Sequence, residues 1–417
     1  MIRGNILYND FCYWRFNLAK AKGPFIWDES GKKLIDFTSG WNVTNLGWNH
    51  PELQNAVIDQ VKKNTYVPMW TADPIQNKYA QALISSLPKE LMVIGRATGG
   101  TEANEEAIKT ARAYTGRKKI IGFKDTYHGQ SYATLALGYS SEYETPKAIS
   151  PMPEGFLQMD FPKTYGDSRN GVKILADFAE KLEENLAKRD VAAVVTEAGI
   201  ITGWGSTFVA PKGYLTLVRK LTKKYGTLLI LDEVGTGFSR CGRLYGMYLE
   251  NVIPDIVTFA KGMSNGVAAI GAMVTTKKIA QKTFNKTNLT STFGWTPIAC
   301  AVGLKVLEIH QRERIWEKAE KDGCYLISQL KREFKNNRLV ENIDGMGMEV
   351  GVRFVKSRKE KPIATLIEEK AYEKGLHLIS DSETNIQLMP PLTIERRFLN
   401  RGIEIFVSLV RTLSSSV

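Results

Sequence analysis

Two side chains suited to catalysis directly follow apolar runs of the kind that form buried strands. Lys261 follows the run 256–260, and Asp232 follows the earlier run 228–231. In open parallel sheets, ligands bind in the crevice at the carboxyl ends of the strands, so these runs can deliver an amine and a carboxylate to one sheet edge. A lysine there can form a Schiff base with a carbonyl cofactor, and an aspartate can hold a pyridinium nitrogen.

A glycine turn offers a binding site for a phosphate. Gly100 and Thr101 lie in a turn before a helical stretch that ends near Gly116. Glycines let backbone amides approach a phosphate, and a helix N-terminus adds unpaired N–H groups and a positive dipole. The alternative is a simple helix cap by Thr101. The sequence contains no GxGxxG or GKS/T motif, which argues against dinucleotide and P-loop sites.

Further candidate groups follow two other predicted strands. Tyr127 and His128 follow the strand 119–123, where an aromatic ring can stack on a planar cofactor or can simply be part of the core. Glu197 lies just past the strand 191–195, as a cofactor-proximal or a structural carboxylate. Together, the strand ends and the glycine turn supply groups for the phosphate, ring face, ring nitrogen and aldehyde of one cofactor. The set therefore predicts an enzyme that uses pyridoxal phosphate.

The composition is that of an ordinary globular protein, with 43% hydrophobic and 24% charged residues. The 417 residues are enough for two or more domains. No stretch approaches the roughly 18 apolar residues of a membrane-spanning helix, and residues 1–16 lack the apolar core of a secretion signal. The four cysteines are scattered without a CxxC pair, which argues against a disulfide or zinc framework. We therefore predict a cytoplasmic protein without a metal site.

The net charge of +12 has two interpretations. One is a nucleic-acid or membrane-surface partner, and the other is a solvated, lysine-rich surface. The basic residues occur in short, dispersed doublets, and none forms a run of five or six. This dispersion favours the solvated surface, so we predict neither a nucleic-acid nor a membrane partner.

Apolar runs alternate with helical patterns through the middle of the chain. The runs 119–123, 191–195, 227–231 and 256–260 predict buried strands, and residues 211–226 predict a helix with one apolar face. This alternation predicts an α/β fold, with a large domain whose mostly parallel central sheet is covered by helices on both faces.

The remaining segments predict a smaller α+β domain and an N-terminal segment that packs on it. A long helix is expected over 296–311, a hairpin over 25–37 and a surface loop over 150–170. The predicted boundaries are 1–48 for the N-terminal segment, 49–308 for the large cofactor-binding domain and 309–417 for the small C-terminal domain.

Between about Phe25 and Leu392 the chain resembles the class III (fold-type I) pyridoxal-phosphate aminotransferases. That group contains acetylornithine, ornithine, 4-aminobutyrate and ω-amine transaminases, and the chain is closest in character to the ω-amine:pyruvate enzymes. The motifs that carry the resemblance are Gly100-Thr101-Glu102-Ala103-Asn104, Tyr127-His128-Gly129, Leu229-Ile230-Leu231-Asp232-Glu233-Val234, Thr236-Gly237-Phe238, Pro254-Asp255-Ile256 with Lys261-Gly262, Ser291-Thr292-Phe293-Gly294, and Pro390-Pro391-Leu392.

The resemblance implies a role for each residue around the cofactor ring. Lys261 is the Schiff-base lysine and proton carrier, and Asp232 pairs with the pyridinium nitrogen. Val234 packs on one ring face and Tyr127 covers the other. Glu197 matches a glutamate near the ring hydroxyl and the aspartate. The implied reaction is a ping-pong amino transfer.

The resemblance also implies the phosphate site and the assembly. Gly100 and Thr101 hold the phosphate, and His128 belongs to the same cofactor-binding set. Thr292 matches a threonine that reaches the phosphate of the neighbouring subunit. A homodimer with shared active sites is therefore expected.

Two family positions that bind substrate carboxylates are altered together. Several members carry an arginine three residues before the Pro-Pro pair, where this chain has Gln387. The glutamate that pairs with that arginine is replaced by Thr202. Because both halves of the ion pair are missing, we expect hydrophobic amines or ω-amino compounds as donors.

Three other departures bear on the pocket. Trp41 and Trp295 would make it aromatic, unless they pack at a domain or dimer interface. Arg96 stands where an aromatic residue is common, as a carboxylate binder or a structural ion-pair partner. Gly235 replaces a frequent glutamine, which removes a hydrogen bond near the cofactor.

The sequence thus favours an aminotransferase that moves an amino group from an amine or ω-amino donor to an oxo acid, with pyruvate expected. The alternatives are a racemase or epimerase on the same scaffold and a transaminase of the acetylornithine or 4-aminobutyrate type. A non-enzymatic basic binding protein with this fold is a further alternative.

Overall fold

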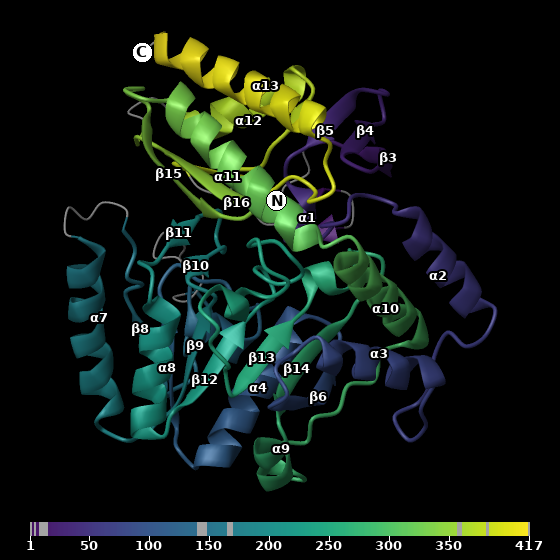
Figure 1. Ribbon diagram of the computed structural model, residues 1–417, viewed down its shortest axis with the longest axis vertical. Coiled ribbons are helices and arrows are strands. Elements are labelled where there is room, and N and C mark those ends of the chain that lie inside the picture. The colour runs from purple at the N-terminus through teal and green to yellow at the C-terminus, as the bar shows by residue number, and fades with distance from the viewer. Residues whose placement is uncertain are drawn as a thin grey trace.

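The computed structural model describes residues 16–139, 148–164, 170–356, 361–380 and 383–415, and a short N-terminal pair of strands, β1 (Ile2–Arg3) and β2 (Ile6–Leu7). The described chain forms two lobes, as Figure 1 shows. The lower lobe in that view contains the large sheet. The upper lobe combines the C-terminal helices with strands from the beginning of the chain.

A seven-stranded sheet forms the centre of the large lobe, in the order β6-β14-β13-β12-β9-β7-β8. All of its strands run parallel except β14, which is antiparallel to both of its neighbours. The predicted mostly parallel α/β sheet is therefore confirmed. The strands are β6 (Leu91–Ala97), β7 (Lys119–Phe123), β8 (Phe156–Met159), β9 (Val191–Glu197), β12 (Leu228–Asp232), β13 (Ile256–Phe259) and β14 (Gly271–Thr276).

Helices cover both faces of this sheet, which explains why its central strands are continuous apolar runs. In β12, Ile230 lies in one apolar cluster with Ala107 and Ile108 of α4. The neighbouring Leu229 lies in the opposite cluster with Val218 of α8. The helices around the sheet are α4 (Gly100–Thr115), α5 (Tyr132–Leu137), α7 (Gly171–Leu186), α8 (Tyr214–Tyr225) and α9 (Lys277–Thr283).

A second group of helices packs beside the sheet at the junction of the lobes. The long helix α10 contacts both α2 and α3, and Thr296 caps it by accepting a hydrogen bond from the backbone of Ala299. The predicted helix over 296–311 is confirmed to within one residue at each end. The bounds are α2 (Pro51–Val61), α3 (Pro74–Ser85) and α10 (Pro297–Arg312).

Two antiparallel-rich sheets build the small lobe. One has the order β15-β16-β18, and the other has the order β17-β5-β4-β3. In the second sheet, the N-terminal strand β5 pairs in parallel with β17 from the C-terminal part of the chain. The strands are β3 (Leu18–Lys22), β4 (Phe25–Asp28), β5 (Lys33–Asp36), β15 (Val340–Met346), β16 (Glu349–Phe354), β17 (Leu376–His377) and β18 (Asn385–Leu388).

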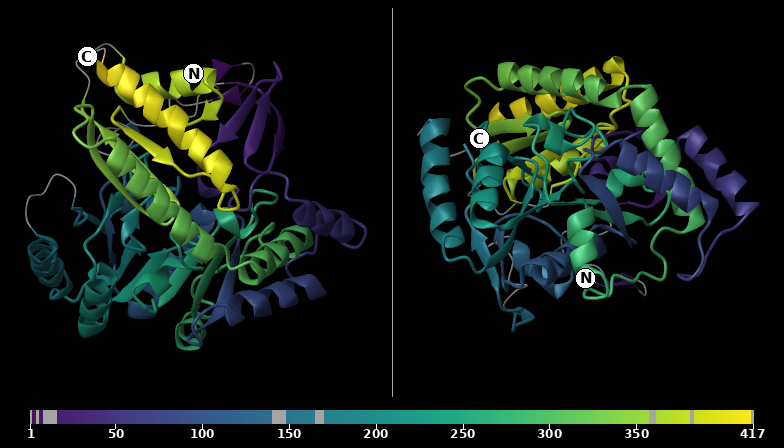
Figure 2. Two further views of the ribbon diagram at one scale, coloured as in Figure 1. Left: turned by 45° about the horizontal axis from the view of Figure 1, so that its top comes forward. Right: turned by 60° about the horizontal axis from the view of Figure 1, so that its bottom comes forward.

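Helices α11 (Ile315–Glu333), α12 (Ile363–Glu373) and α13 (Arg396–Ser415) pack on these sheets, in the lobe that lies uppermost in the left view of Figure 2. Short elements complete the chain between the lobes: α1 (Ser39–Asn42), β10 (Ile200–Ile201), β11 (Phe208–Val209), and two 3-10 helices, η1 (Gly246–Leu249) and η2 (Lys261–Met263). The domain boundaries 48/49 and 308/309 remain a proposal, supported by the division into two lobes.

Two sequence expectations about the fold need correction. Residues 150–170 were expected to form a surface loop, but residues 156–159 form β8, the edge strand that pairs in parallel with β7. The helix expected over 211–226 begins later, at Tyr214, because Pro211 and Gly213 form a turn before it. Its end at Gly226, in the left-handed conformation at φ 63°, is as predicted.

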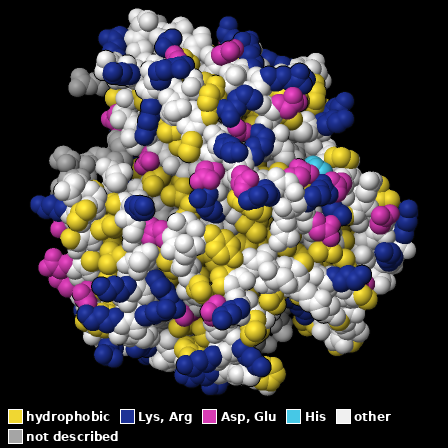
Figure 3. All heavy atoms as spheres, viewed as in Figure 1, with side chains coloured by type: hydrophobic (Ala, Val, Ile, Leu, Met, Phe, Trp, Pro, Cys, Tyr) yellow, Lys and Arg dark blue, Asp and Glu magenta, His cyan; other side chains and the backbone are white. Residues whose placement is uncertain are grey.

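The distribution of charged side chains on the surface agrees with the dispersed basic doublets of the sequence. Figure 3 shows lysine and arginine side chains scattered among acidic ones over one face of the molecule. None of the helices in the described part of the chain combines the length and the apolar character needed to span a bilayer.

Candidate active site

The register of the central strands brings the predicted groups to one edge of the sheet. Asp232, the last residue of β12, lies opposite Glu197 of β9 and Thr258 of β13. Lys261 follows β13 as the first residue of η2. Glu197 is itself the last residue of β9 rather than a residue beyond it. The carboxylates and the amine thus come from the ends of three adjacent parallel strands.

Asp232 is held by three hydrogen bonds. Its Oδ2 accepts from Nδ2 of Asn104 at 2.8 Å and lies 2.7 Å from Nδ1 of His128. Its Oδ1 accepts from the backbone N–H of Val234 at 2.8 Å. The side chain is buried, so these partners fix the orientation of a carboxylate that water reaches poorly.

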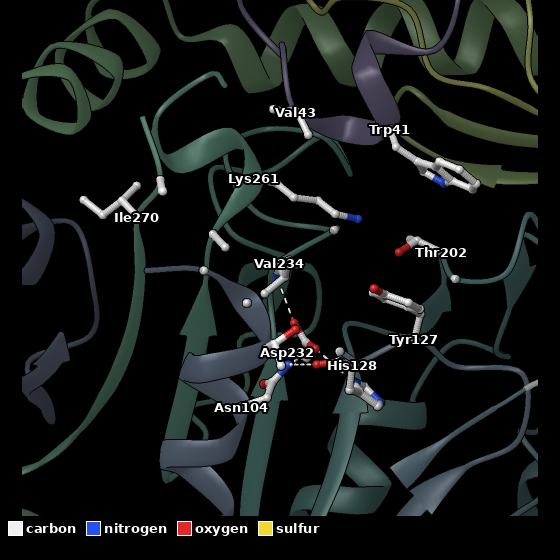
Figure 4. Close-up of a pocket in the computed structure, with 18 of the residues that line it drawn as sticks. Trp41, Val43, Asn104, Tyr127, His128, Thr202, Asp232, Val234, Lys261 and Ile270 are labelled. Carbon is white, nitrogen blue, oxygen red and sulfur yellow. Dashed lines mark hydrogen bonds and ion pairs between the residues drawn. The ribbon is translucent and has the colours of Figure 1, made fainter. Parts of the chain in front are cut away.

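Lys261 extends from η2 into open space above Asp232. In Figure 4 its amine points between Trp41 and Thr202. Burial lowers the pKa of Lys261 from its usual value of 10.5, although nearby Glu197 and other carboxylates oppose that shift. A lowered pKa favours the neutral amine that a nucleophile or a proton acceptor requires. The residue also adopts a left-handed φ of 38°, a strained conformation typical of functional sites.

A cavity of about 480 Å³ lies above these groups, a size usual for small-molecule sites. The cavity is bordered by every predicted cofactor residue except Thr292, and also by Trp41 and Thr202. Val234 and Tyr127 both point into the space above Asp232 (Figure 4). The predicted set is therefore brought together in one place, apart from Thr292 and Gln387.

The turn before α4 forms one end of the cavity. Glu102 braces this turn, because its Oε2 accepts from the backbone N–H and the hydroxyl of Thr98 at 2.7 and 2.6 Å. The first N–H groups of α4 have no partner within the helix, so this helix end can bind an anion. A Cβ at Gly100 would lie only 3.1 Å from both methyl groups of Val234, so a larger residue there would crowd the cofactor side of the turn.

Glu197 is fixed at the side of the cavity by Thr202. The backbone N–H of Thr202 donates to both carboxylate oxygens, and its hydroxyl donates to Oε2 at 2.5 Å. Burial raises the pKa of Glu197 to about 7, and the adjacent Asp232 adds to this effect. A Cβ at Gly235 would lie 2.4 Å from the Thr202 hydroxyl. Thr202 thus occupies the space that a side chain at position 235 would need.

The comparisons with known proteins agree with this geometry. The family model described as "Aminotransferase class-III" matches residues 11–410. This chain belongs to the class III aminotransferases. It is an enzyme that depends on pyridoxal phosphate.

Relatives of this aminotransferase cover nearly its whole length. An acetylornithine aminotransferase from Methanothermobacter thermautotrophicus is 30% identical over 95% of this chain and 94% of its own. A thermostable (S)-enantioselective omega-transaminase from Thermomicrobium roseum is 31% identical, with a TM-score of 0.88 over 95% of this chain and 92% of its own. An amine transaminase from an uncultivated Pseudomonas species, solved with its cofactor bound, is 25% identical, with a TM-score of 0.91 over 100% of this chain and 99% of its own.

The residues present in this aminotransferase fit pyridoxal phosphate. The anion-binding helix end, a fixed carboxylate and a lysine of lowered pKa lie around one cavity. Gly203 allows Tyr127 to approach the site, since a Cβ at position 203 would lie 2.6 Å from the backbone nitrogen of Tyr127. The Tyr127 ring is in turn fixed by an edge contact with Trp204, with ring centroids 5.3 Å apart.

Trp295 and Arg96 lie outside the cavity, like Gln387 and Thr292. Trp295 does not make the pocket aromatic, because it is buried, donates to the carbonyl of Gly271 at 2.7 Å and packs on Tyr79. Arg96 does not border the cavity, and its charge only partly opposes the rise in the pKa of Glu106 that burial causes.

Thr292 borders a separate hollow that it shares with Phe293 and with Gly100 and Thr101 of the turn before α4. Its predicted contact with the neighbouring subunit remains a proposal.

The sequence reasoning missed three buried polar residues. Asn104 supports Asp232, as described above. Glu349 lies behind the cavity wall, where its Oε1 accepts from Nε2 of Gln387 at 3.1 Å. Arg240 is fully buried between the lobes and donates to the carbonyls of Met348 and Pro390 at 3.1 and 2.9 Å. Asparagine, glutamate and arginine are also common on protein surfaces, so nothing in the sequence indicated that these three are buried. Only the structure shows which residues they contact.

Proposed function

We propose that this aminotransferase takes amino groups from hydrophobic amines or ω-amino compounds and passes them to an oxo acid, with pyruvate as the acceptor. One observation carries the donor part of the proposal. Among the described residues that border the cavity, Lys261 is the only lysine or arginine. Gln387, at the family's arginine position, is buried behind Trp41 and does not border the cavity. A donor with a carboxylate beside its reacting amine therefore lacks a partner for that carboxylate.

We further propose the roles of the site residues. Pyridoxal phosphate supplies an aldehyde that condenses with amines and a ring that withdraws electrons from the reacting carbon. Lys261 holds this group and, once released, carries the proton at its Nζ. Asp232 holds the positive charge at the ring nitrogen. Val234 and Tyr127 confine the ring, and the turn at Gly100 and Thr101 binds the phosphate.

A homodimer with shared sites is the proposed assembly. Support comes from large apolar side chains that lie exposed, one of which, Phe293, borders a hollow beside the turn at Gly100 and Thr101. Trp70 and Phe293 are 83% and 64% exposed, and Phe293 makes a ring contact with Tyr66. Exposed aromatic groups of this kind mark protein interfaces. Light scattering of the purified enzyme would test the assembly, and a monomer would contradict it.

A cytoplasmic location is also proposed. Cys241, Cys300 and Cys324 are all free in the described chain, as expected in a reducing compartment. Fractionation of cells that express the protein would test this.

The donor proposal is tested with a panel of amines. Each of 1-phenylethylamine, putrescine, β-alanine, 4-aminobutyrate and ornithine is paired with pyruvate and with 2-oxoglutarate. We expect the highest kcat/KM with an amine that lacks an α-carboxylate, and with pyruvate. Highest activity with ornithine and 2-oxoglutarate would instead favour the acetylornithine type, the activity named for one relative.

The same preparation separates amino transfer from racemisation. With donor but no oxo acid, a transaminase accumulates pyridoxamine phosphate, which is followed by its absorbance. A racemase leaves the cofactor in its aldehyde form and inverts the donor instead.

A further inference from the structure

The wall of the cavity that carries Trp41 has an unusual backbone. Ser39, Gly40, Trp41 and Asn42 have φ angles of 47°, 57°, 69° and 62°, so four consecutive residues are left-handed. Only Gly40 adopts this conformation without cost. For other residues the cost is about 1–3 kcal/mol each, and such strain persists only where the surroundings impose it. Some other part of the molecule must therefore hold this turn.

The small lobe holds the turn through its side chains. The Ser39 hydroxyl donates to the carbonyl of Met389 at 2.7 Å. Nε1 of Trp41 donates to Oε1 of Gln387 at 3.2 Å, and Nδ2 of Asn42 donates to Oε2 of Glu349 at 2.5 Å. The side chains of Ser39, Trp41 and Asn42 thus bind to the residue that follows β18, to β18 and to β16, respectively.

Glu349 accepts hydrogen bonds from Asn42 and from Gln387, so it takes part in two of these three connections. It is 1% exposed and does not border the cavity. One oxygen accepts from Asn42, and the other accepts from Gln387 Nε2 at 3.1 Å and from the Thr207 hydroxyl at 3.3 Å. Nε2 of Gln387 also donates to the carbonyls of Thr202 and Ser206 and to the Thr207 hydroxyl, each at 3.2 Å, while its Oε1 faces Trp41. Glu349 is the charged member of this acceptor set, so it strengthens the amide orientation that the indole contacts.

The position of Glu349 changes the interpretation of Gln387, which stands where several family members have an arginine. Thr202 and Gln387 suggested that both charges of the family's ion pair are absent, but a buried carboxylate remains beside Gln387. Its oxygens accept from Asn42 of the turn, from Gln387, which contacts the indole, and from Thr207. Burial raises the pKa of Glu349, and the nearby charges of Arg240 and Lys261 oppose that shift.

We propose that Glu349 is a positioning residue that sets donor specificity by holding Trp41 across the cavity, through Asn42 and Gln387. The inference rests on the proposed function, since it names the device that presents an aromatic wall to the donor. A fixed indole stacks on flat apolar donors and fills the space that a carboxylate would need.

A double-mutant cycle between Glu349→Met and Trp41→Ala tests the proposal. The cycle uses whichever donor of the panel gives the wild type its highest kcat/KM, so it remains informative if the hydrophobic-donor proposal fails. Hydrogen bonds to a buried charged group carry enough free energy for changes of about tenfold or more. We expect Glu349→Met to raise KM about tenfold in the wild type, with kcat within about threefold. In the Trp41→Ala background the same change should alter KM less than about twofold.

Two further variants make the result decisive. Glu349→Gln keeps one acceptor oxygen, so its KM should rise less than that of Glu349→Met. If Glu349→Met does not fold, Glu349→Gln replaces it in the cycle. Glu368→Gln is the matched control, because Glu368 is a buried acid of the small lobe that accepts from Ser380 and does not border the cavity. It should change the melting temperature but leave KM unchanged. An equal rise in KM with and without the Trp41 ring, or no rise at all, would overturn the proposal.

Discussion

Removal of the Asn104 side chain should weaken cofactor binding although Asn104 was not assigned a role from the sequence. Its Nδ2 donates to Asp232 and to the carbonyl of His128, and its Oδ1 accepts from the Thr258 hydroxyl at 2.7 Å. Asn104→Ala would leave Asp232 with two of its three hydrogen bonds. The side chain of Asp232 would then be free to rotate away from the ring nitrogen.

The magnitude follows from the burial of both partners. Asn104 and Asp232 are each 2% exposed, so water cannot fully replace the lost bond. A hydrogen bond to a charged group is worth about 1.5–3 kcal/mol, which corresponds to a factor of about ten to a hundred. We expect the Kd for pyridoxal phosphate to rise by that factor, and kcat to fall at saturating cofactor.

The assay is a titration of cofactor-free protein with pyridoxal phosphate, followed by absorbance, with kcat measured at saturation. The matched control is Thr258→Val, which removes the donor to Asn104 and leaves Asp232 its three partners. It should change Kd less than about threefold. If the folded Asn104→Ala variant bound the cofactor as tightly as the wild type, the assignment of Asp232 as a carboxylate fixed by Asn104 would be wrong.

Three other changes test separate parts of the structure. Gln387→Arg alone should not raise kcat/KM for ornithine, because the guanidinium would pair with Glu349, whereas the double variant with Glu349→Met should raise it about tenfold. Gly203→Ala should weaken cofactor binding about tenfold, measured by the same titration, because the new Cβ would lie 2.6 Å from Tyr127. Burial raises the pKa of Glu106 from 4.5 to about 7, so the native state loses stability as pH rises through that interval, by up to about 3 kcal/mol. The free energy of urea unfolding of Glu106→Gln, relative to the wild type, should therefore rise by about 3 kcal/mol between pH 4.5 and pH 8. If this difference did not change with pH, the raised pKa of Glu106 would be refuted.

The sequence predicted the buried strands β7, β9, β12 and β13 but missed β14, which lies between β6 and β13 and is almost fully buried. Residues 228–232 form an uninterrupted apolar run ending in Asp232 because helices cover both sides of β12. The edge strand β6 contains Gly95 and Arg96 and is only partly buried, so its pattern is broken. The short strand β8 lies in a Pro-rich segment and gave no strand pattern. Apolar periodicity identifies the centre of such a sheet better than its edges.

The residues of the candidate site also fall into two groups, those that could be predicted from the sequence and those that could not. Groups at strand ends, such as Asp232 and Lys261, could be predicted because strand order brings strand ends together. The environment of Trp41 and Trp295 could not be predicted, since an indole suits both a pocket wall and a core. The partners of Glu349 come from segments separated by more than 300 and by 38 positions. No local pattern connects such distant segments.

The buried guanidinium of Arg240 has a consequence for movement between the lobes. Besides the two carbonyls of the small lobe, it donates to Oδ1 of Asn45 at 2.7 Å, so one side chain of the large lobe joins two other parts of the chain. Separating these parts would leave a desolvated cation without its acceptors, at a cost of several kcal/mol. These contacts therefore oppose a movement of the small lobe away from Arg240, and they hold this side of the crevice in one arrangement before an amine arrives.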